Sequence, residues 1–291
     1  MPPTKIPFIT LNNKTKIPQL GFGTYLIPAS KAHELIYKAC KQGYRHFDTA
    51  AITKNEVEVS GGIVKFIKEE AKQTGSSFDE IRKQFYYTTK LWNDDCTSHE
   101  AATKGIDTCL QKAGELQYID LLLIHSPLMG PKNRIATWSA MQDYDTSKVR
   151  SIGISNFGVK HIEQLLFWDG LKIKPVLNQI EISPWVMRQG IVDFCKKNEI
   201  ALEAYSPLTH AKKLADPELV DIAKKNGISP TEVLLKWSVQ KGFIPLPKST
   251  STEHMASNFN IFNHKLSEED ILKLSHPEAH QPTGWECTEC D

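Results

Sequence analysis

The sequence predicts an α/β fold in which eight parallel strands, with helices between them, close into a (β/α)8 TIM barrel. Short apolar runs alternate with longer helical patterns along the chain, which is the order that repeated βα units of a parallel sheet produce. The length of 291 residues suits a barrel of roughly 250 residues. No Pro/Ser/Gly-rich linker divides the chain, so residues 1–291 are expected to form a single domain with a C-terminal extension from about Ser267.

The predicted barrel strands are short apolar runs that end in polar or turn residues. They comprise residues 21–25, 45–47, 85–89, 119–124, 151–154, 175–178, 201–204 and 243–247. A hairpin pattern precedes them, with a turn at Asn12-Asn13 between residues 8–11 and 14–18. This hairpin is expected to plug one end of the barrel.

The helices between these runs are predicted from periodicity and from capping residues. Apolar residues recur with helical spacing at Ala32, Leu35, Ile36, Ala39 and Cys40, and again at Val59, Ile63, Phe66 and Ile67. Such a stripe buries one face of a helix. Asp216-Pro217 and Ser229-Pro230-Thr-Glu232 each place a cap residue before a first-turn proline, the second as a capping box. Both are expected to begin helices.

The composition limits the kinds of binding partner that are expected. Apolar residues make up 40% and charged residues 24%, and the formal net charge is +1, so a packed core is expected and nucleic acid is not. The start of the chain lacks the charged and apolar regions of a signal peptide, and no later apolar run approaches the ~18 residues of a membrane span. A cytoplasmic protein without a membrane partner is expected. No coiled-coil pattern is present, so a monomer is expected.

The six cysteines are scattered through predicted elements rather than spaced as a disulfide framework, which suits a reducing compartment. Cys287-Thr-Glu-Cys290 has the spacing of a redox or metal pair, but no second pair lies nearby in the sequence. An ordinary tail segment is favoured, and no metal is expected.

Polar residues follow or end the apolar runs at the places where a barrel carries its chemistry. They are Asp48, Lys90, His125, Ser155, Asn156, Gln179, Tyr205 and Lys248. Side chains at the C-terminal ends of barrel strands converge, so these residues are expected to form one site. Each alone would also suit a structural ion pair or a hydrogen-bonded histidine at the barrel rim.

Several segments around these residues form an ordered set. They are Gly21-Phe-Gly-Thr-Tyr25, Gly43-Tyr-Arg-His-Phe-Asp-Thr-Ala50, Asn55-Glu56, Thr88-Thr-Lys-Leu-Trp92, Ile119-Asp-Leu-Leu-Leu-Ile-His-Ser-Pro127, Gly153-Ile-Ser-Asn-Phe157, Asn178-Gln-Ile-Glu181, Tyr205-Ser-Pro-Leu208 and Pro247-Lys-Ser249. Together they resemble the aldo-keto reductase superfamily over nearly the whole chain. Residues 179–188 and the ending Gly284-Trp-Glu-Cys look most like a fungal branch that includes the conjugated polyketone reductases.

The resemblance implies reversible hydride transfer between a nicotinamide cofactor and a carbonyl. Hydride addition leaves negative charge on the carbonyl oxygen, which a positioned donor must stabilise and then protonate. In the family a tyrosine is this donor, and a nearby ammonium lowers its pKa from about 10. By resemblance Lys90 supplies the ammonium, Asp48 holds Lys90, and His125 directs a ring N–H at the carbonyl oxygen.

Thr53 departs from the family pattern, because it occupies the position of the proton-donating tyrosine. A threonine hydroxyl is far less acidic than a phenol, and its shorter side chain leaves room for water. Proton delivery could pass to His125 if protonated, to Lys90, to water or to Lys54. Two functions stay open: NADPH-dependent reduction of small aldehydes, ketones or diketones, and a catalytically impaired NADP(H)-binding protein with a sensing or sequestering role.

The resemblance also implies a cofactor site. Ser155, Asn156 and Gln179 would bond the nicotinamide amide, Tyr205 would stack on its ring, and Ser206 and Leu208 would line the diphosphate. Gly23, Thr24, Tyr25 and Asp48 are also expected to contact the cofactor. No Gly-x-Gly-x-x-Gly opens a helix after a strand, so a Rossmann domain is not indicated.

The cofactor is expected to be NADPH (NADP+). Lys248, Ser249, Thr250 and Ser251 offer an ammonium and hydroxyls suited to the adenosine 2′-phosphate. His254 stands where the family has an arginine, so bidentate phosphate binding is reduced. Asn258, another position of the family's cofactor site, is retained. Tyr25 and Trp92, with His125, are expected to face the substrate.

Overall fold

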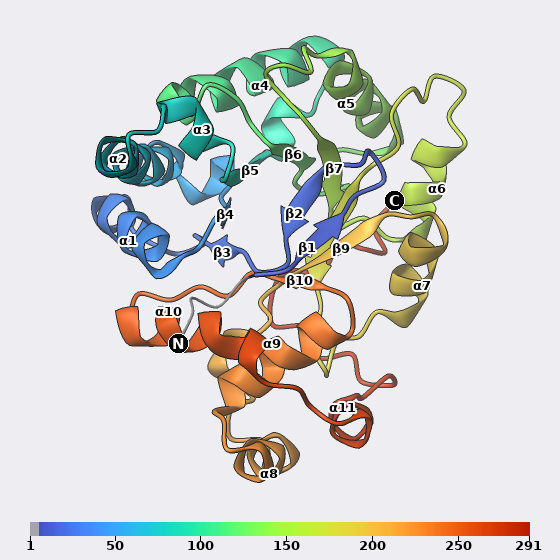
Figure 1. Cartoon of the computed structure of the whole chain (residues 1–291). Helices are drawn as coiled ribbons and strands as arrows, with labels where there is room; N and C mark the ends of the chain where they lie inside the picture. The colour runs from blue at the N-terminus through green and yellow to red at the C-terminus, as the bar shows by residue number, and fades with distance from the viewer. Residues whose placement is uncertain (1–5) are drawn as a thin grey trace.

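Eight short parallel strands form one sheet whose spatial order follows the chain (Figure 1). The computed structural model describes residues 6–291, so residues 1–5, which contributed to the expectation of no signal peptide, lie outside it. The barrel strands are β3 (Phe22–Gly23), β4 (His46–Asp48), β5 (Tyr86–Leu91), β6 (Leu121–Ile124), β7 (Ile152–Ser155), β8 (Leu177–Glu181), β9 (Ala201–Tyr205) and β10 (Ile244–Pro245). Each lies within or overlaps a predicted run.

The first and last strands meet through backbone hydrogen bonds. The Gly21 N–H donates to the Pro245 carbonyl at 3.1 Å, and the Gly23 N–H donates to the Pro247 carbonyl at 3.0 Å. A Cβ atom on Gly21 would lie 2.4 Å from a Leu246 side-chain methyl carbon, so a larger residue would displace the Leu246 side chain at this seam. The predicted α/β barrel is therefore confirmed.

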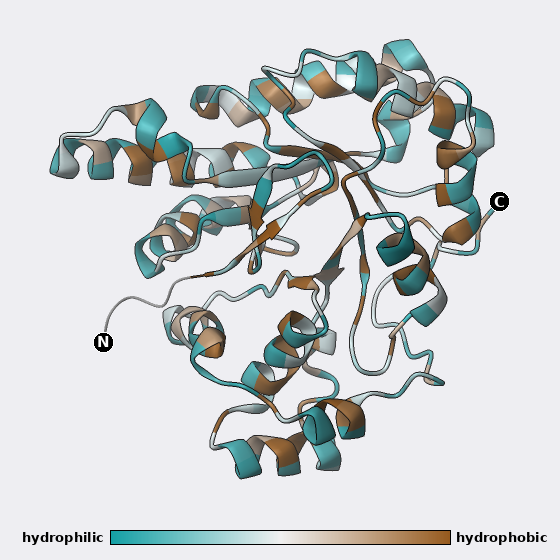
Figure 2. Cartoon of the chain, turned by 45° about the vertical axis from the view of Figure 1, so that its right-hand side comes forward, coloured by the Kyte–Doolittle hydropathy of each residue, from teal (hydrophilic) through white to brown (hydrophobic). Residues whose placement is uncertain are grey.

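Helices surround the sheet and cover its outer face (Figure 2). They are α1 (Ala29–Gln42), α2 (Glu56–Thr74), α3 (Phe78–Arg82), α4 (His99–Ala113), α5 (Pro131–Asp143), α6 (Val159–Leu166), α7 (Gln189–Lys197), α8 (Pro217–Asn226), α9 (Pro230–Gln240), α10 (Thr252–Phe259) and α11 (Glu268–Leu274). The apolar stripes predicted for α1 and α2 are largely buried. Asp216 caps α8, and Ser229 forms the predicted capping box of α9. No helix within residues 6–291 is long and apolar enough to cross a membrane.

The N-terminal hairpin closes the end of the barrel where the strands begin. Strands β1 (Phe8–Thr10) and β2 (Lys16–Pro18) pair antiparallel, and the Asn12 side chain donates to the Pro175 carbonyl at 2.9 Å, just before β8. Leu11 and Ile17 pack against residues that include Tyr86, Leu121, Val176 and Ile244. The expectation that the hairpin plugs one end is confirmed.

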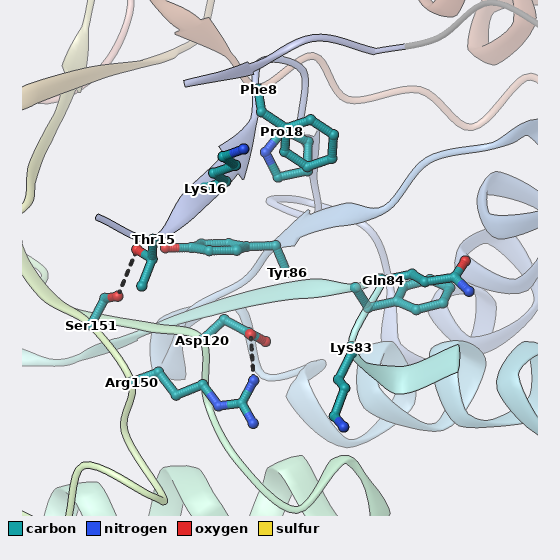
Figure 3. A pocket seen from close by; sticks show the side chains of 11 residues that line it. Phe8, Thr15, Lys16, Pro18, Lys83, Gln84, Tyr86, Asp120, Arg150 and Ser151 are labelled. Atoms are coloured by element: carbon teal, nitrogen blue, oxygen red, sulfur yellow. Dashed lines mark hydrogen bonds and ion pairs between the residues drawn. The ribbon is translucent and has the colours of Figure 1, made fainter. Parts of the chain in front are cut away.

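A groove of about 170 Å³ opens beside this hairpin (Figure 3). Lys16, Tyr86, Asp120 and Arg150 are among the residues that line it, and Arg150 pairs with Asp120 at 4.0 Å. Tyr86 begins β5, so the groove lies at the end of the barrel opposite to the polar residues that end the strands. The chemistry predicted from the sequence belongs to that other end.

Candidate active site

Asp48 and Lys90 form a buried ion pair because β4 and β5 are neighbouring parallel strands. The Lys90 ammonium donates to both Asp48 carboxylate oxygens and to the Thr49 carbonyl, each at 2.8 Å. An ammonium has three N–H donors, so all three are used within the protein. Burial raises the pKa of Asp48, Lys90 opposes this rise, and the nearby Glu203 adds to it. The Lys90 ammonium therefore has no N–H group left for another partner.

His125 follows β6 directly and lies against two indole rings. Its ring meets Trp92 edge-on at 5.0 Å between centroids and stacks on Trp285 at 5.8 Å. Burial, together with the charge of Lys90, lowers the pKa of His125 to about 3. The imidazole is thus expected to be neutral near neutral pH, which disfavours a protonated His125 as the acid. A neutral ring still has one N–H to donate.

The Thr53 hydroxyl is occupied by its own loop. Its Oγ1 atom lies 2.6 Å from the Ala50 carbonyl oxygen, 2.7 Å from Asn55 Oδ1 and 2.9 Å from Thr49 Oγ1. A hydroxyl carries one proton, and both the carbonyl and the amide oxygen accept it. Within residues 6–291 no hydrogen bond joins Thr53 to Lys90. The side chain therefore secures the loop after β4 rather than replacing a phenol beside the ammonium.

The predicted nicotinamide residues lie on adjacent strands and contact one another. Ser155 pairs with Gln179 across β7 and β8, and its hydroxyl donates to the Gln179 carbonyl at 2.8 Å. The Asn156 side chain donates to the His125 carbonyl at 2.9 Å and accepts from the Tyr205 hydroxyl at 2.9 Å. The Gln179 side chain donates to Asp48 at 2.9 Å. The structure thus joins the predicted cofactor and catalytic residues in one network.

The loop after β9 holds an unusual run of backbone conformations. Ser206, Thr209, His210 and Ala211 have φ values of 48°, 52°, 51° and 64°, in the left-handed region. Such conformations are costly for residues other than glycine and gather at functional loops. Leu208 lies within this run. Sequence reasoning predicted contacts at Ser206 and Leu208 but missed the strain, because these residues carry no glycine signal.

The segment predicted for the 2′-phosphate leads into the first turn of α10. The Ser251 side chain accepts from the His254 N–H at 3.4 Å, and Ser249 donates to the Ser251 carbonyl at 3.1 Å. Both serines therefore order this turn, while Lys248 and Thr250 are exposed. Asn258 is buried further along the helix. The segment follows β10, so it lies at the same end of the barrel as the other predicted residues.

The C-terminal tail is bound to the loops at this end. The Glu181 carboxylate accepts the Thr283 N–H at 2.7 Å, the Thr283 hydroxyl at 2.6 Å and the Gly284 N–H at 2.9 Å. Arg188 pairs with Glu286 at 2.7 Å. Trp285 lies between these anchors, which explains its contact with His125. Sequence reasoning missed Trp285 as a site residue, although residues 179–188 and Gly284-Trp-Glu-Cys, which contains Trp285, were both part of the fungal resemblance.

Apolar side chains are exposed around the same end. Gly23 ends β3, and the Thr24 N–H donates to the Asp48 carbonyl at 3.0 Å, so the loop after β3 begins beside the ion pair. Tyr25 in this loop is 57% exposed and Leu128, after β6, is 48% exposed. Tyr25 and Leu128 are thus exposed apolar side chains on loops at the end of the barrel that holds the ion pair.

Comparisons with known proteins identify the family. The chain matches the model of the Aldo/keto reductase family over residues 19–276. An uncharacterized oxidoreductase of Saccharomyces cerevisiae is 47% identical over 97% of this chain and 98% of the relative, which fits the predicted fungal branch. Glyoxal reductase of Bacillus subtilis is 36% identical over 94% of each chain.

A solved structure agrees with this match. The Bombyx mori aldo-keto reductase in complex with NADP has a TM-score of 0.82 and 33% identity, covering 93% of this chain and 92% of the other. The barrel, the Asp48–Lys90 pair with His125 beside it, and the family match lead to the same conclusion. The chain belongs to the aldo/keto reductase family.

Proposed function

We propose that this protein reduces small aldehydes, ketones or diketones to alcohols by hydride transfer from NADPH, without a tyrosine acid. The observation that carries the proposal is the buried Asp48–Lys90 pair beside a neutral His125, joined to Gln179 at one end of the barrel. In this proposal the whole chain acts as one barrel domain.

The residues present fit a nicotinamide cofactor. When bound, NADPH supplies the hydride. Both N–H groups of the Gln179 amide are held by carboxylates, and no hydrogen bond within residues 6–291 uses its Oε1 atom. Oε1 therefore remains as an acceptor for a carboxamide N–H, while the Ser155 hydroxyl donates to the Gln179 backbone carbonyl and accepts from the Asn156 side chain. Tyr205, which is partly exposed, would stack on the nicotinamide ring.

In this proposal the catalytic roles follow from these contacts. The neutral His125 donates a ring N–H to the carbonyl oxygen, and the Lys90 charge stabilises the negative charge that develops there. All three Lys90 N–H groups are already donated, so Lys90 is a poor proton source. The Thr53 hydroxyl is bonded within its loop. Lys54 is exposed to solvent, so water is left as the proton source in this proposal.

This arrangement favours activated carbonyls. An oxyanion next to a second carbonyl is a weaker base and needs less help from a strong acid, so α-diketones and α-ketoaldehydes should react better than simple aldehydes. The relative named glyoxal reductase, at 36% identity, supports this substrate class. The exposed Tyr25 and Leu128 side chains favour substrates that carry an apolar substituent.

Single-turnover oxidation of NADPH tests the proposal. The protein in excess over NADPH is mixed with an α-diketone, and loss of NADPH absorbance is followed, with cofactor binding measured separately by calorimetry. Oxidation that depends on the diketone and is lost in Lys90→Met supports catalysis. Tight binding without oxidation would instead support the sensing or sequestering alternative.

Cofactor preference gives a second expected outcome. Lys248 and the following hydroxyls remain while His254 replaces the arginine, so NADPH should bind more tightly than NADH. His254→Arg should strengthen NADPH binding about tenfold, the effect of one charge-assisted hydrogen bond of ~1.4 kcal/mol, without a comparable gain for NADH. Calorimetric titration with both cofactors measures this, and Lys248→Met serves as the opposite control. Equal affinities of the natural protein for NADPH and NADH would refute the NADPH assignment.

A further inference from the structure

A second carboxylate, that of Glu203, lies buried inside the barrel close to Asp48 and has no part in the proposed hydride transfer. Glu203, on β9, has no exposed surface. Its Oε2 atom accepts a hydrogen bond of 2.6 Å from the Gln179 side chain, and its Oε1 atom lies 3.2 Å from His46 Nε2. A buried carboxylate is costly unless its contacts compensate for lost hydration. The contacts of the Glu203 carboxylate must therefore offset the free-energy cost of burying it.

The Gln179 amide nitrogen is shared between two carboxylates. It donates to Asp48 Oδ2 at 2.9 Å and to Glu203 Oε2 at 2.6 Å, which uses both of its N–H groups. The amide oxygen must then lie on the other side of the amide group. If the amide were flipped, its oxygen would face two carboxylate oxygens, and no hydrogen-bond donor would lie between them. Asp48 and Glu203 together thus disfavour the flipped orientation of the Gln179 amide.

Asp48 alone would hold the amide less firmly. Both Asp48 oxygens already accept from the Lys90 ammonium, so much of the Asp48 charge is compensated. The only hydrogen bond to the Glu203 carboxylate within residues 6–291 comes from Gln179, and it is shorter than the bond from Gln179 to Asp48. His46 lies on the other side of the Glu203 carboxylate and restricts its movement. Glu203 therefore contributes most of the preference for one amide orientation.

We infer that Glu203 is a positioning residue that fixes the Gln179 side-chain amide with its oxygen available to the cofactor. This inference rests on the proposed function, because it assumes that the nicotinamide carboxamide binds at Gln179. The fixed oxygen can only accept, so it selects a cofactor whose substituent donates an N–H. A cofactor that has a methyl group in place of the amide –NH2 would leave this buried acceptor without a partner.

Two dinucleotides distinguish these cases. NADP+ carries the carboxamide, whereas its 3-acetylpyridine analogue keeps the carbonyl oxygen but replaces –NH2 by methyl. Dissociation constants for both are measured by calorimetry with the natural protein, Glu203→Leu and Glu203→Gln. The natural protein should prefer NADP+ by about fivefold or more, the effect of one hydrogen bond. Glu203→Leu should lose most of this preference, and Glu203→Gln, which keeps an uncharged acceptor, should lose about half of it.

Thr88→Val is the matched control. Thr88 is also buried inside the barrel and lies 3.5 Å from His46, but it makes no hydrogen bond to Gln179. A general weakening of the barrel would lower both affinities together and leave their ratio unchanged, as expected for Thr88→Val. Thermal unfolding shows which variants are folded.

The outcomes are separable. An unchanged ratio in a folded Glu203→Leu protein overturns the inference, and if that variant does not fold, an unchanged ratio in Glu203→Gln does so. Equal affinities of the natural protein for the two dinucleotides also overturn it. Failure of the natural protein to bind either dinucleotide would instead contradict the proposed function itself, and with it the premise of the inference.

Discussion

Replacing Thr53 by tyrosine is expected to raise kcat/KM for a simple aldehyde by roughly 10²–10⁴-fold, the usual contribution of a positioned general acid. The tyrosine would fill the space next to the Asp48–Lys90 pair and bring a phenol near His125. The Lys90 ammonium would lower the phenol pKa and make it a competent donor. Steady-state rates with a simple aldehyde and with an α-diketone measure the change, and the gain should be larger for the aldehyde.

Two variants separate the effect of the phenol hydroxyl from the effect of the aromatic ring. Thr53→Phe places the same ring without the hydroxyl, so it should give no comparable gain. The double variant Thr53→Tyr, Lys90→Met should lose most of the gain, because the phenol would no longer lie beside an ammonium. If the natural protein reduces simple aldehydes as fast as Thr53→Tyr does, another group already supplies the proton, and the role assigned to water is wrong.

The sequence predicted the barrel well because its strands are marked independently of tertiary structure. Each strand is a short apolar run followed by a helix with a regular stripe, and caps such as Ser229 act through residues only three positions away. Strand lengths were less predictable. The run 243–247 forms only a two-residue strand, Ile244–Pro245, since prolines at 245 and 247 lack the N–H that would extend the ladder.

The site was predictable to the extent that it depends on strand order. Asp48 ends β4, Lys90 lies one residue before the end of β5, and Gln179 lies in the middle of β8. Their side chains meet because these strands belong to one parallel barrel, and the sequence contains that strand order. The contact of Trp285 with His125 was not predictable, because it depends on how a tail without regular secondary structure is anchored by Glu181 about a hundred residues earlier. Nor could the sequence predict that the Thr53 hydroxyl bonds within its own loop.

Stability should depend on pH through His125. Its pKa is about 3 in the folded protein against 6.5 for an unperturbed histidine. Between these values the unfolded chain binds a proton that the folded protein does not, so the free energy of unfolding rises with pH. The stability that comes from the neutral His125 is present above about pH 6.5 and decreases as the pH falls from there toward 3. The loss attributable to His125 is up to about 2 kcal/mol at about pH 5. The same neutrality implies that kcat/KM shows no inflection from His125 in this range.

Urea unfolding of the natural protein and of His125→Gln, each near pH 7.5 and near pH 5, isolates this contribution. Other groups, including Asp48, titrate in both proteins, so only the difference between the two pH dependences reports on His125. The natural protein should lose up to about 2 kcal/mol more than His125→Gln on acidification. Trp285→Ala should reduce the difference, because removing the stacked indole hydrates the imidazole and raises its pKa. Equal pH dependences in the natural protein and His125→Gln would mean that the folded protein protonates His125 as readily as the unfolded chain does, and His125 would then again be a candidate proton donor.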